Sequence, residues 1–405
     1  MDKPRFDIVV FGATSFVGQL VCRYLSERYG DDSEVRWAMA GRSRDKLARV
    51  RSEIGGPEVA MIVADANDND SLAAMCKQTR VIISTVGPYA LYGEALVAIC
   101  ADTGTDYCDL TGEVHWIADM LSKYEDKAKA SGARIVHCCG FDSLPSDLGV
   151  HFLQKHSVER FGAPCTRVKL RVKAMRGTFS GGTVASLVNF AKDLRENPAL
   201  RKQLANPYSI CPEGYRPDVR QPNPKGASYD KDANSWIAPF IMASCNTRVV
   251  QRSNALSNQA YGADFKYDEA MMTGRGTKGR LSAYGLAAAL GGFLAGVAMK
   301  PSRALLQRFV LPAPGDGPSP SAQKNGFYDI RLYGTTAAGD KLKAKVVGDR
   351  DPGYGSTSKM LPEAAICLAE RGETEGGFWT PATLLGDALI ERLHERAGVT
   401  FEMID

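Results

Sequence analysis

The sequence lacks several features that mark particular classes of protein. Its ten cysteines include no C-x-x-C pair, so we expect reduced thiols and no metal site. Its net charge is only +4 over 405 residues, which excludes the basic excess typical of a nucleic-acid binder. No internal repeat is present, and an apolar strand pattern starts at Phe6, which leaves no room for an export signal before it. We therefore expect a cytoplasmic protein.

The bulk composition is that of an ordinary globular protein. Hydrophobic residues make up 44% of the chain and charged residues 24%. A chain of 405 residues is long enough to bury two separate cores. We therefore expect two domains.

The clearest motif joins an apolar, β-branched run to a helical pattern. Residues 6–11 read FDIVVF and residues 12–18 read GATSFVG. Gly12 permits a tight turn at the strand end, and Gly18 lets the next helix lie close to the sheet, so free N–H groups point into the turn. Ser15 replaces the middle glycine of the usual dinucleotide fingerprint. The strand before the turn and the helix after it favour a pyrophosphate site over an ordinary βα turn. The expected cofactor contacts in this turn are Gly12, Thr14, Ser15, Phe16, Val17 and Gly18.

The second strand, residues 35–40, ends where an NAD-binding unit carries an acidic residue for the ribose 2′-hydroxyl. Arg42 stands there instead, followed by Ser43 and, in the next helix, Lys46. A guanidinium can fork onto a 2′-phosphate, so we predict NADP as the cofactor. The alternative is a solvated arginine on a loop. Asp65, after the third strand, is placed either to touch the adenine edge or to cap a helix.

The later strands of this region complete a doubly wound pattern. Strands at residues 81–86, 107–109 and 134–139 alternate with helices. Six strands in this alternation fit a parallel Rossmann sheet of order 3-2-1-4-5-6 over residues 1–145. The loop after the fourth strand lies beside the cofactor crevice in such a sheet. The expected contacts there are Thr85, Val86, Gly87 and Pro88.

Beyond residue 145 the pattern changes. Residues 167–173 and 341–346 alternate cationic and apolar side chains, which is typical of strands with one basic and one apolar face. We predict an α/β protein whose second domain, residues 146–350, is α+β with a mostly antiparallel sheet. The basic face is either a solvated surface or a docking surface for an acidic carrier. The cations concerned are Lys169, Arg171, Lys343 and Lys345.

Residues 281–299 contain no charged side chain. Their length is close to that of a membrane span, but alanines and glycines make the segment only weakly hydrophobic. One alternative is a buried, close-packed helix. The other is a helix that lies at the bilayer surface, lines an acyl-chain channel or forms a dimer interface. We expect the second alternative, with peripheral membrane contact or a homodimer and a lipid-like substrate.

Seven segments resemble the saccharopine dehydrogenase-like oxidoreductases, specifically the subgroup of the trans-acting enoyl reductases of lipid polyketide synthesis. These segments are residues 12–18, 40–43, 85–89, 107–113, 140–147, 181–183 and 353–355. The resemblance implies an NADPH-dependent oxidoreductase with a substrate domain inserted after the sixth strand. It also implies that the C-terminal helices, residues 351–405, pack back on the first domain. The implied reaction is hydride transfer to the activated C=C bond of an enoyl substrate that is lipid-like or bound to an acyl carrier.

The first domain contains no Tyr-x-x-x-Lys reductase pair, so the proton donor must be sought elsewhere. The candidates are Tyr89, Asp142 and Tyr354. Asp142 precedes a helix start at Pro145 that is aimed back at the crevice, although it is equally suited to cap that helix. Two other functions stay open. One is reduction of a C=N bond, as in saccharopine dehydrogenases, and the other is a catalytically silent, lipid-associated interaction protein that binds NADPH.

Overall fold

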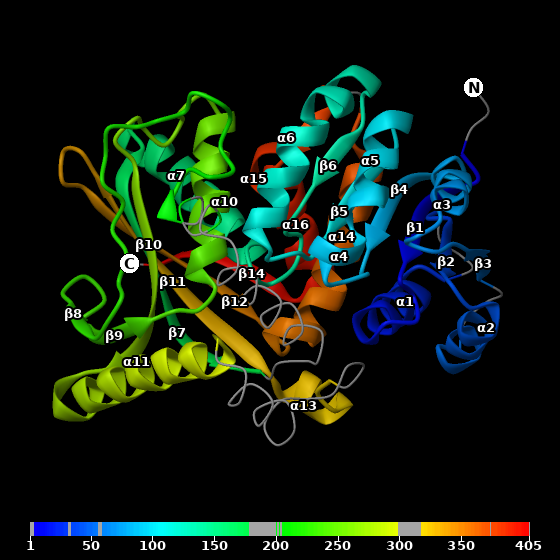
Figure 1. Ribbon diagram of the computed structural model, residues 1–405. Coiled ribbons are helices and arrows are strands. Elements are labelled where there is room, and N and C mark those ends of the chain that lie inside the picture. Colours follow the sequence, from blue (N-terminus) through cyan, green and yellow to red (C-terminus); the bar gives the residue numbers. More distant parts are fainter. Residues whose placement is uncertain are drawn as a thin grey trace.

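The computed structural model describes residues 4–30, 34–55, 59–177, 200, 202, 205–298, 317–372 and 374–404. These residues form two seven-stranded sheets. In Figure 1, sheet A lies in the right half of the view with the N-terminus above it, and sheet B lies in the left half beside the C-terminus.

Sheet A is parallel throughout and has the order β13-β6-β5-β4-β1-β2-β3. Its strands are β1 (Phe6–Phe11), β2 (Trp37–Gly41), β3 (Ala60–Val63), β4 (Thr79–Ser84), β5 (Asp106–Asp109), β6 (Arg134–Val136) and β13 (Gly377–Trp379). The predicted order 3-2-1-4-5-6 is confirmed. A seventh strand, from near the C-terminus, extends the sheet beyond β6.

Helices cover both faces of sheet A. One face carries α1 (Phe16–Arg28), α2 (Arg44–Glu53) and α14 (Thr357–Glu370), and the other carries α3 (Asn69–Cys76), α5 (Glu94–Thr103) and α6 (Val114–Ser131). Along β1, Ile8 and Val10 face the first group of helices, whereas Val9 and Phe11 face the second. Because successive side chains point to opposite faces, a strand covered on both sides reads as a continuous apolar run.

Sheet B is mixed and has the order β14-β12-β11-β7-β10-β9-β8. Its strands are β7 (Cys165–Arg176), β8 (Ser228–Asp230), β9 (Ser235–Pro239), β10 (Lys266–Gly274), β11 (Phe327–Thr336), β12 (Lys341–Gly348) and β14 (Val399–Ile404). Strands β7 and β10 are parallel, and every other neighbouring pair is antiparallel. Helix α7 (Leu144–Phe161) packs on β11 and β12, and α10 (Ala243–Leu256) packs on β10. The predicted fold class, a Rossmann sheet followed by a mostly antiparallel sheet, is confirmed.

The chain after residue 350 contributes to both sheets. The turn η1 (Pro352–Ser356) leads into α14, which contacts α1 and β4. Strand β13 pairs with β6 of sheet A, and β14 pairs with β12 of sheet B. Between these strands lie α15 (Pro381–Leu384), α16 (Gly386–Arg392) and η2 (Leu393–Ala397), and α13 (Pro320–Asn325) precedes β11. The domain limits at residues 145 and 350 stay predictions.

Strand β6 is shorter than the sequence predicts. It ends at Val136 because Cys138 has a φ of +64°, which no extended strand accommodates. The residue 181–183 segment of the family resemblance lies outside the described residues.

Helix α11 (Gly276–Ala298) contains most of the charge-free segment. It lies along the lower edge of sheet B in Figure 1 and contacts β9 and β10. Ala283 is buried, but Leu281, Tyr284 and Leu286 are 68%, 52% and 38% exposed. The alternative of a buried, close-packed helix therefore does not hold, and the expected contact with lipid or with a second copy stays a prediction. In the part of the chain that the structure describes, no helix is both long and apolar enough to cross a membrane.

Candidate active site

The turn after β1 has the geometry expected of a pyrophosphate-binding loop. Gly12 has a φ of +90°, and a Cβ there would lie 2.6 Å from the Thr85 hydroxyl oxygen and 2.8 Å from a Val86 methyl group. A Cβ on Gly18 would collide with the Gly12 carbonyl oxygen. Ser15 caps α1 by accepting a hydrogen bond from the Gly18 backbone N–H at 3.0 Å. Only glycine fits both positions, so the backbone of the turn stays open to a phosphate.

The loop after β4 is tied to this turn. The Thr85 hydroxyl oxygen lies 3.0 Å from the Gly12 carbonyl oxygen and 3.0 Å from the Ser15 hydroxyl oxygen. Gly87 is exposed and Pro88 is half-buried at the same edge of the sheet. The structure thus brings the two loops together as a dinucleotide site requires. The contacts of these residues with a cofactor stay a prediction.

Arg42 follows Gly41, which lies beside the glycine turn. A Cβ on Gly41 would lie 3.8 Å from the Thr14 hydroxyl oxygen. Ser43 caps α2 by accepting a hydrogen bond from the Lys46 backbone N–H at 3.3 Å. The Arg42 side chain is exposed and has no hydrogen bond or ion pair within the described residues. A guanidinium with its donors unused at this strand end fits a 2′-phosphate.

The other predicted cofactor contacts differ in their surroundings. Asp65 accepts hydrogen bonds from the backbone and the side chain of Asn67, at 3.0 Å and 3.3 Å. It does not cap α3, because Asp68 fills that position. Phe16 is the first residue of α1, and Val17, which follows it, packs half-buried against the core.

The two predicted tyrosine donors lie in different places. Tyr354, in η1, is 2% exposed, and its ring meets the Phe16 ring edge-on with 5.3 Å between centroids. Tyr89 is buried against Trp116, and its hydroxyl donates to the Ser84 carbonyl oxygen at 2.9 Å. Burial raises the pKa of Tyr89 well above its usual value. The Tyr89 hydroxyl therefore stabilises the loop after β4, whereas Tyr354 lies against the glycine turn.

Asp142 lies between β6 and α7, at the edge of sheet A where the parallel strands end. A Cβ on Gly112 would lie 3.3 Å from Asp142 Oδ2 and 3.9 Å from the terminal methyl group of Met242. Within the described ranges the carboxylate has no hydrogen bond or ion pair. It does not cap α7, whose N-cap is Ser143. Burial raises the pKa of Asp142 to about 6. Such an acid still binds a proton near neutral pH and can donate it.

Two further acidic residues, to which no role was assigned from the sequence, hold the loops at this edge. Asp109 accepts hydrogen bonds from the backbone N–H groups of Thr111 and Cys138, at 3.1 Å each, and its Oδ2 lies 2.7 Å from His137 Nδ1. Glu113 accepts from the first two backbone N–H groups of α4, at 3.0 Å and 2.9 Å. Helix α4 (Tyr89–Tyr92) follows the loop after β4. The available signal was position, because Asp109 ends a buried strand and Glu113 follows it within the same loop.

Several cations of the basic strand face of sheet B are paired with acidic residues of the same sheet. Arg171 is 2% exposed and pairs with Asp230 at 2.7 Å and with Asp268 at 2.6 Å. Lys169 also pairs with Asp230, at 3.2 Å. On β12, Lys345 pairs with an acidic residue of β14 at 2.8 Å. The buried Arg171 is therefore not available to a partner, whereas Lys169 and Lys345 stay 22% and 26% exposed.

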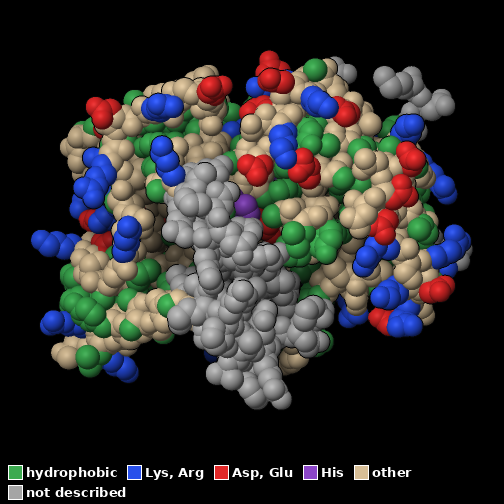
Figure 2. All heavy atoms as spheres, in the orientation of Figure 1, with side chains coloured by type: hydrophobic (Ala, Val, Ile, Leu, Met, Phe, Trp, Pro, Cys, Tyr) green, Lys and Arg blue, Asp and Glu red, His purple; other side chains and the backbone are tan. Residues whose placement is uncertain are grey.

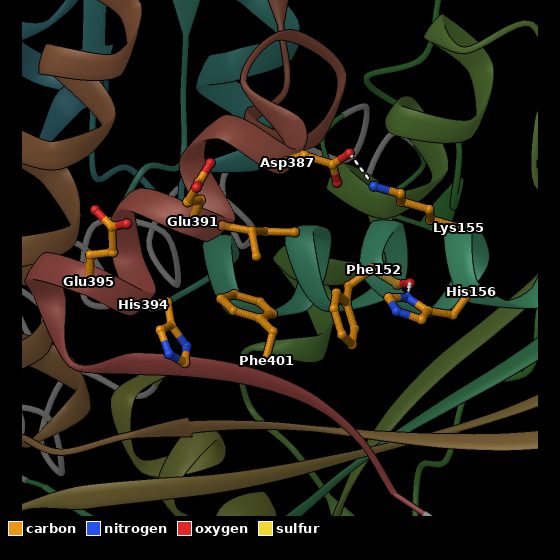
Figure 3. A pocket seen from close by; sticks show the side chains of 9 residues that line it. Phe152, Lys155, His156, Asp387, Glu391, His394, Glu395 and Phe401 are labelled. Atoms are coloured by element: carbon orange, nitrogen blue, oxygen red, sulfur yellow. Dashed lines mark hydrogen bonds and ion pairs between the residues drawn. The ribbon is translucent and has the colours of Figure 1, made fainter. Parts of the chain in front are cut away.

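A separate hollow of about 450 Å³ lies between α7, α16 and β14. Figure 3 shows Phe152 and Phe401 on its floor, with 6.1 Å between their ring centroids. Asp387, at its edge, pairs with Lys155 at 2.7 Å. None of the residues predicted to bind the cofactor or donate a proton lines this hollow. It is not part of the candidate active site.

A comparison with family models defines the class of the protein. Residues 8–136 match the saccharopine dehydrogenase NADP binding domain. This range contains the glycine turn, Arg42 and the loop after β4. The protein is an NADP-dependent oxidoreductase, in agreement with the predicted cofactor.

Full-length relatives identify the family. A Mycobacterium tuberculosis protein assigned as a trans-acting enoyl reductase is 40% identical over 416 residues, which cover 98% of each chain. The trans-acting enoyl reductase of Mycobacterium bovis is 39% identical over 414 residues, which cover 96% of each chain. The solved structure of apo saccharopine dehydrogenase (L-Glu forming) from Saccharomyces cerevisiae has a similar fold. It has a TM-score of 0.50 and 15% identity, and the match covers 99% of this chain and 100% of that one. The chain belongs to the saccharopine dehydrogenase-like oxidoreductases, in the subgroup of the trans-acting enoyl reductases.

Proposed function

We propose that the protein uses NADPH to reduce the activated C=C bond of an enoyl thioester, with a lipid-like acyl chain that is free or bound to a carrier protein. The observation that carries this proposal is the Asp142 carboxylate. It is held without a partner among the described residues at the carboxyl edge of the sheet whose glycine turn fits the cofactor. The names of the full-length relatives support the same reaction.

In this proposal, residues of the chain bind the cofactor, orient it and protonate the substrate. The backbone of the turn at Gly12 and the guanidinium of Arg42 bind the phosphates of the cofactor. NADPH, when bound, supplies the hydride. Asp142 donates its proton to the carbon next to the substrate carbonyl group, which balances the hydride that enters at the other carbon of the double bond. Tyr354, packed on Phe16, keeps water away from the turn.

The test is turnover of NADPH with matched enoyl thioester and imine substrates, followed by absorbance. We expect oxidation of NADPH with the enoyl thioester only. Asp142→Asn should lower kcat by about a hundredfold or more, the usual contribution of a general acid. Asp119→Asn, the same substitution at an exposed position of α6, serves as the matched control. Turnover of the imine alone would make the protein a C=N reductase, and tight NADPH binding without turnover of either substrate would make it a silent binding protein.

We also propose that α11 makes peripheral contact with lipid, which would bring the enzyme to lipid-like substrates. The support is its exposed apolar side chains, Leu281 and Leu286 among them. In Figure 2 the surface over this helix shows hydrophobic side chains, with Lys and Arg side chains at its margin. A helix of this kind can also join a second copy of the chain.

Flotation with anionic vesicles tests this contact. Leu281→Glu with Leu286→Glu should abolish flotation while NADPH binding stays unchanged. Ser52→Glu with Ser122→Glu adds the same charge at exposed positions of α2 and α6 and should float like the unmodified protein. A dimer detected by sedimentation that the α11 variant abolishes, without any flotation, would assign the surface to a homodimer instead.

A further inference from the structure

A basic hollow of about 580 Å³ lies at the start of β7 and β10, where it continues the strand face that carries Lys169 and Arg171. Its lining residues are Arg167, Arg220, Gln221, Pro222, Asn223, Lys225 and Lys266. Three of its four cations, Arg220, Lys225 and Lys266, are exposed and have no hydrogen bond or ion pair within the described residues. Arg167 is the exception, because it pairs with Asp268.

The two sides of the hollow are fixed to each other. Arg167 and Lys266 are register partners on the parallel strands β7 and β10. The opposite side is the loop before β8, which the Gln221 side chain anchors to the sheet. This amide donates to the Phe265 carbonyl oxygen at 2.8 Å and accepts from the Tyr267 backbone N–H at 3.1 Å. The loop that carries Arg220 and Lys225 is therefore held beside the strands that carry Arg167 and Lys266.

The distribution of charge on this sheet is uneven. Lys169 and Arg171, on β7, are neutralised by aspartates. Asp218 and Asp264 lie two residues along the chain from Arg220 and Lys266, but neither forms an ion pair with a described cation of the hollow. Three of the cations that line this hollow thus have no acidic partner among the described residues.

The exposure of these side chains indicates the kind of partner. A small dianion needs converging, buried donors, and the one half-buried guanidinium here is already paired with Asp268. Long, exposed cations around a shallow hollow instead accelerate the approach of an acidic protein surface and orient it.

We propose that this hollow docks the acidic face of the acyl carrier domain that delivers the substrate. This inference rests on the proposed function, because it concerns the carrier-bound form of the same enoyl thioester. In this proposal the contact residues are Arg220, Lys225 and Lys266, and not the strand cations that were named from the sequence.

The test compares a crotonyl group on a purified bacterial acyl carrier protein with free crotonyl-pantetheine. At about 50 mM salt, Arg220→Glu with Lys266→Glu should lower kcat/KM for the carrier substrate about tenfold or more and remove its salt dependence. It should leave kcat/KM for crotonyl-pantetheine unchanged. Arg23→Glu with Lys77→Glu changes the net charge equally at exposed positions of the first domain, and should leave both substrates unaffected.

A second measurement separates docking from catalysis. Fluorescence anisotropy of the labelled, acylated carrier should give a Kd that rises about tenfold in the hollow variant and stays unchanged in the control. An unchanged Kd and an unchanged kcat/KM in the hollow variant would overturn the docking proposal. Binding of inorganic phosphate at the hollow without binding of the carrier would also overturn it, in favour of a small anion. Failure to reduce either substrate would overturn the proposed function, while the anisotropy measurement would still decide the docking.

Discussion

Replacing Asp142 with asparagine should separate its proposed chemical role from its effect on stability. The substitution keeps the shape of the side chain and removes its titration. Burial raises the pKa of Asp142 from its usual value of 3.8 to about 6. The protonated acid is therefore the form that the fold accommodates, and the charged form is the costly one.

The sign of the pH dependence follows from this shift. Below about pH 4 the carboxyl is protonated in both the folded and the unfolded chain, so the aspartate has no charge penalty there. As pH rises towards 6 the unfolded chain loses its proton first, and the stability of the native protein falls relative to that of the variant. About two pKa units correspond to about 3 kcal/mol, which is an upper limit because the side chain is only half-buried. Asp147 and Glu269, whose pKa values burial also raises to about 7, are present in both proteins and cancel.

The assay combines urea unfolding with turnover. At about pH 8, Asp142→Asn should be more stable than the native protein by up to about 3 kcal/mol, and the difference should shrink below about pH 5. Its kcat with an enoyl thioester should fall as described above, with an unchanged Kd for NADPH. A variant that keeps its kcat within about twofold would refute the donor role. A stability difference that does not change with pH would refute the reasoning from burial.

Three further predictions concern the cofactor site and sheet B. Arg42→Ala should weaken NADPH binding by about 1.5–3 kcal/mol and leave NADH binding nearly unchanged. Arg44→Ala, which removes a neighbouring exposed cation, should alter the binding of neither cofactor. Equal losses of affinity for both cofactors, measured by calorimetry, would contradict this prediction. Gly12→Val should abolish binding of either cofactor, because its Cβ would meet the Thr85 hydroxyl oxygen at 2.6 Å, whereas Gly285→Ala adds a methyl group to open space and should bind normally. Retained affinity in the first variant would place the site elsewhere. Asp268→Asn should lower the free energy of unfolding by about 3–5 kcal/mol, because it deprives the buried Arg171 of a carboxylate, whereas Lys345→Met should cost about 1 kcal/mol or less. Equal losses of unfolding free energy in the two variants, measured with urea, would show that the buried ion pair contributes no more than the exposed one.

The sequence predicted the parts of the fold whose information is local. The first strand, its glycine turn and the following helix are adjacent in the chain, and the alternation of β and α segments fixed the order of six strands. Strand β13 was not predicted, because a three-residue strand that pairs with β6 has no periodicity of its own. Its existence depends on a partner far away in the sequence.

In the candidate site, too, local features could be predicted and long-range contacts could not. Gly12 and Arg42 could be located because their positions relative to the strands carry the signal. The paired state of Arg171 could not, since its aspartate partners come from β8 and β10, which lie far from it in the sequence. An alternating pattern gives the direction of a side chain but not the charge of what it faces. For the same reason the sequence could not show which cations of sheet B are paired.

The late strand β13 also has a consequence for how the protein is made. During synthesis, residues 6–136 emerge long before Gly377–Trp379, so the edge of β6 stays unpaired until nearly the whole chain has left the ribosome. The apolar face that α14 covers is open for the same period. An N-terminal fragment that ends after β6 would therefore carry an open strand edge and an uncovered core, both of which promote aggregation. Strand β13 thus completes, late in synthesis, a sheet that β1 begins.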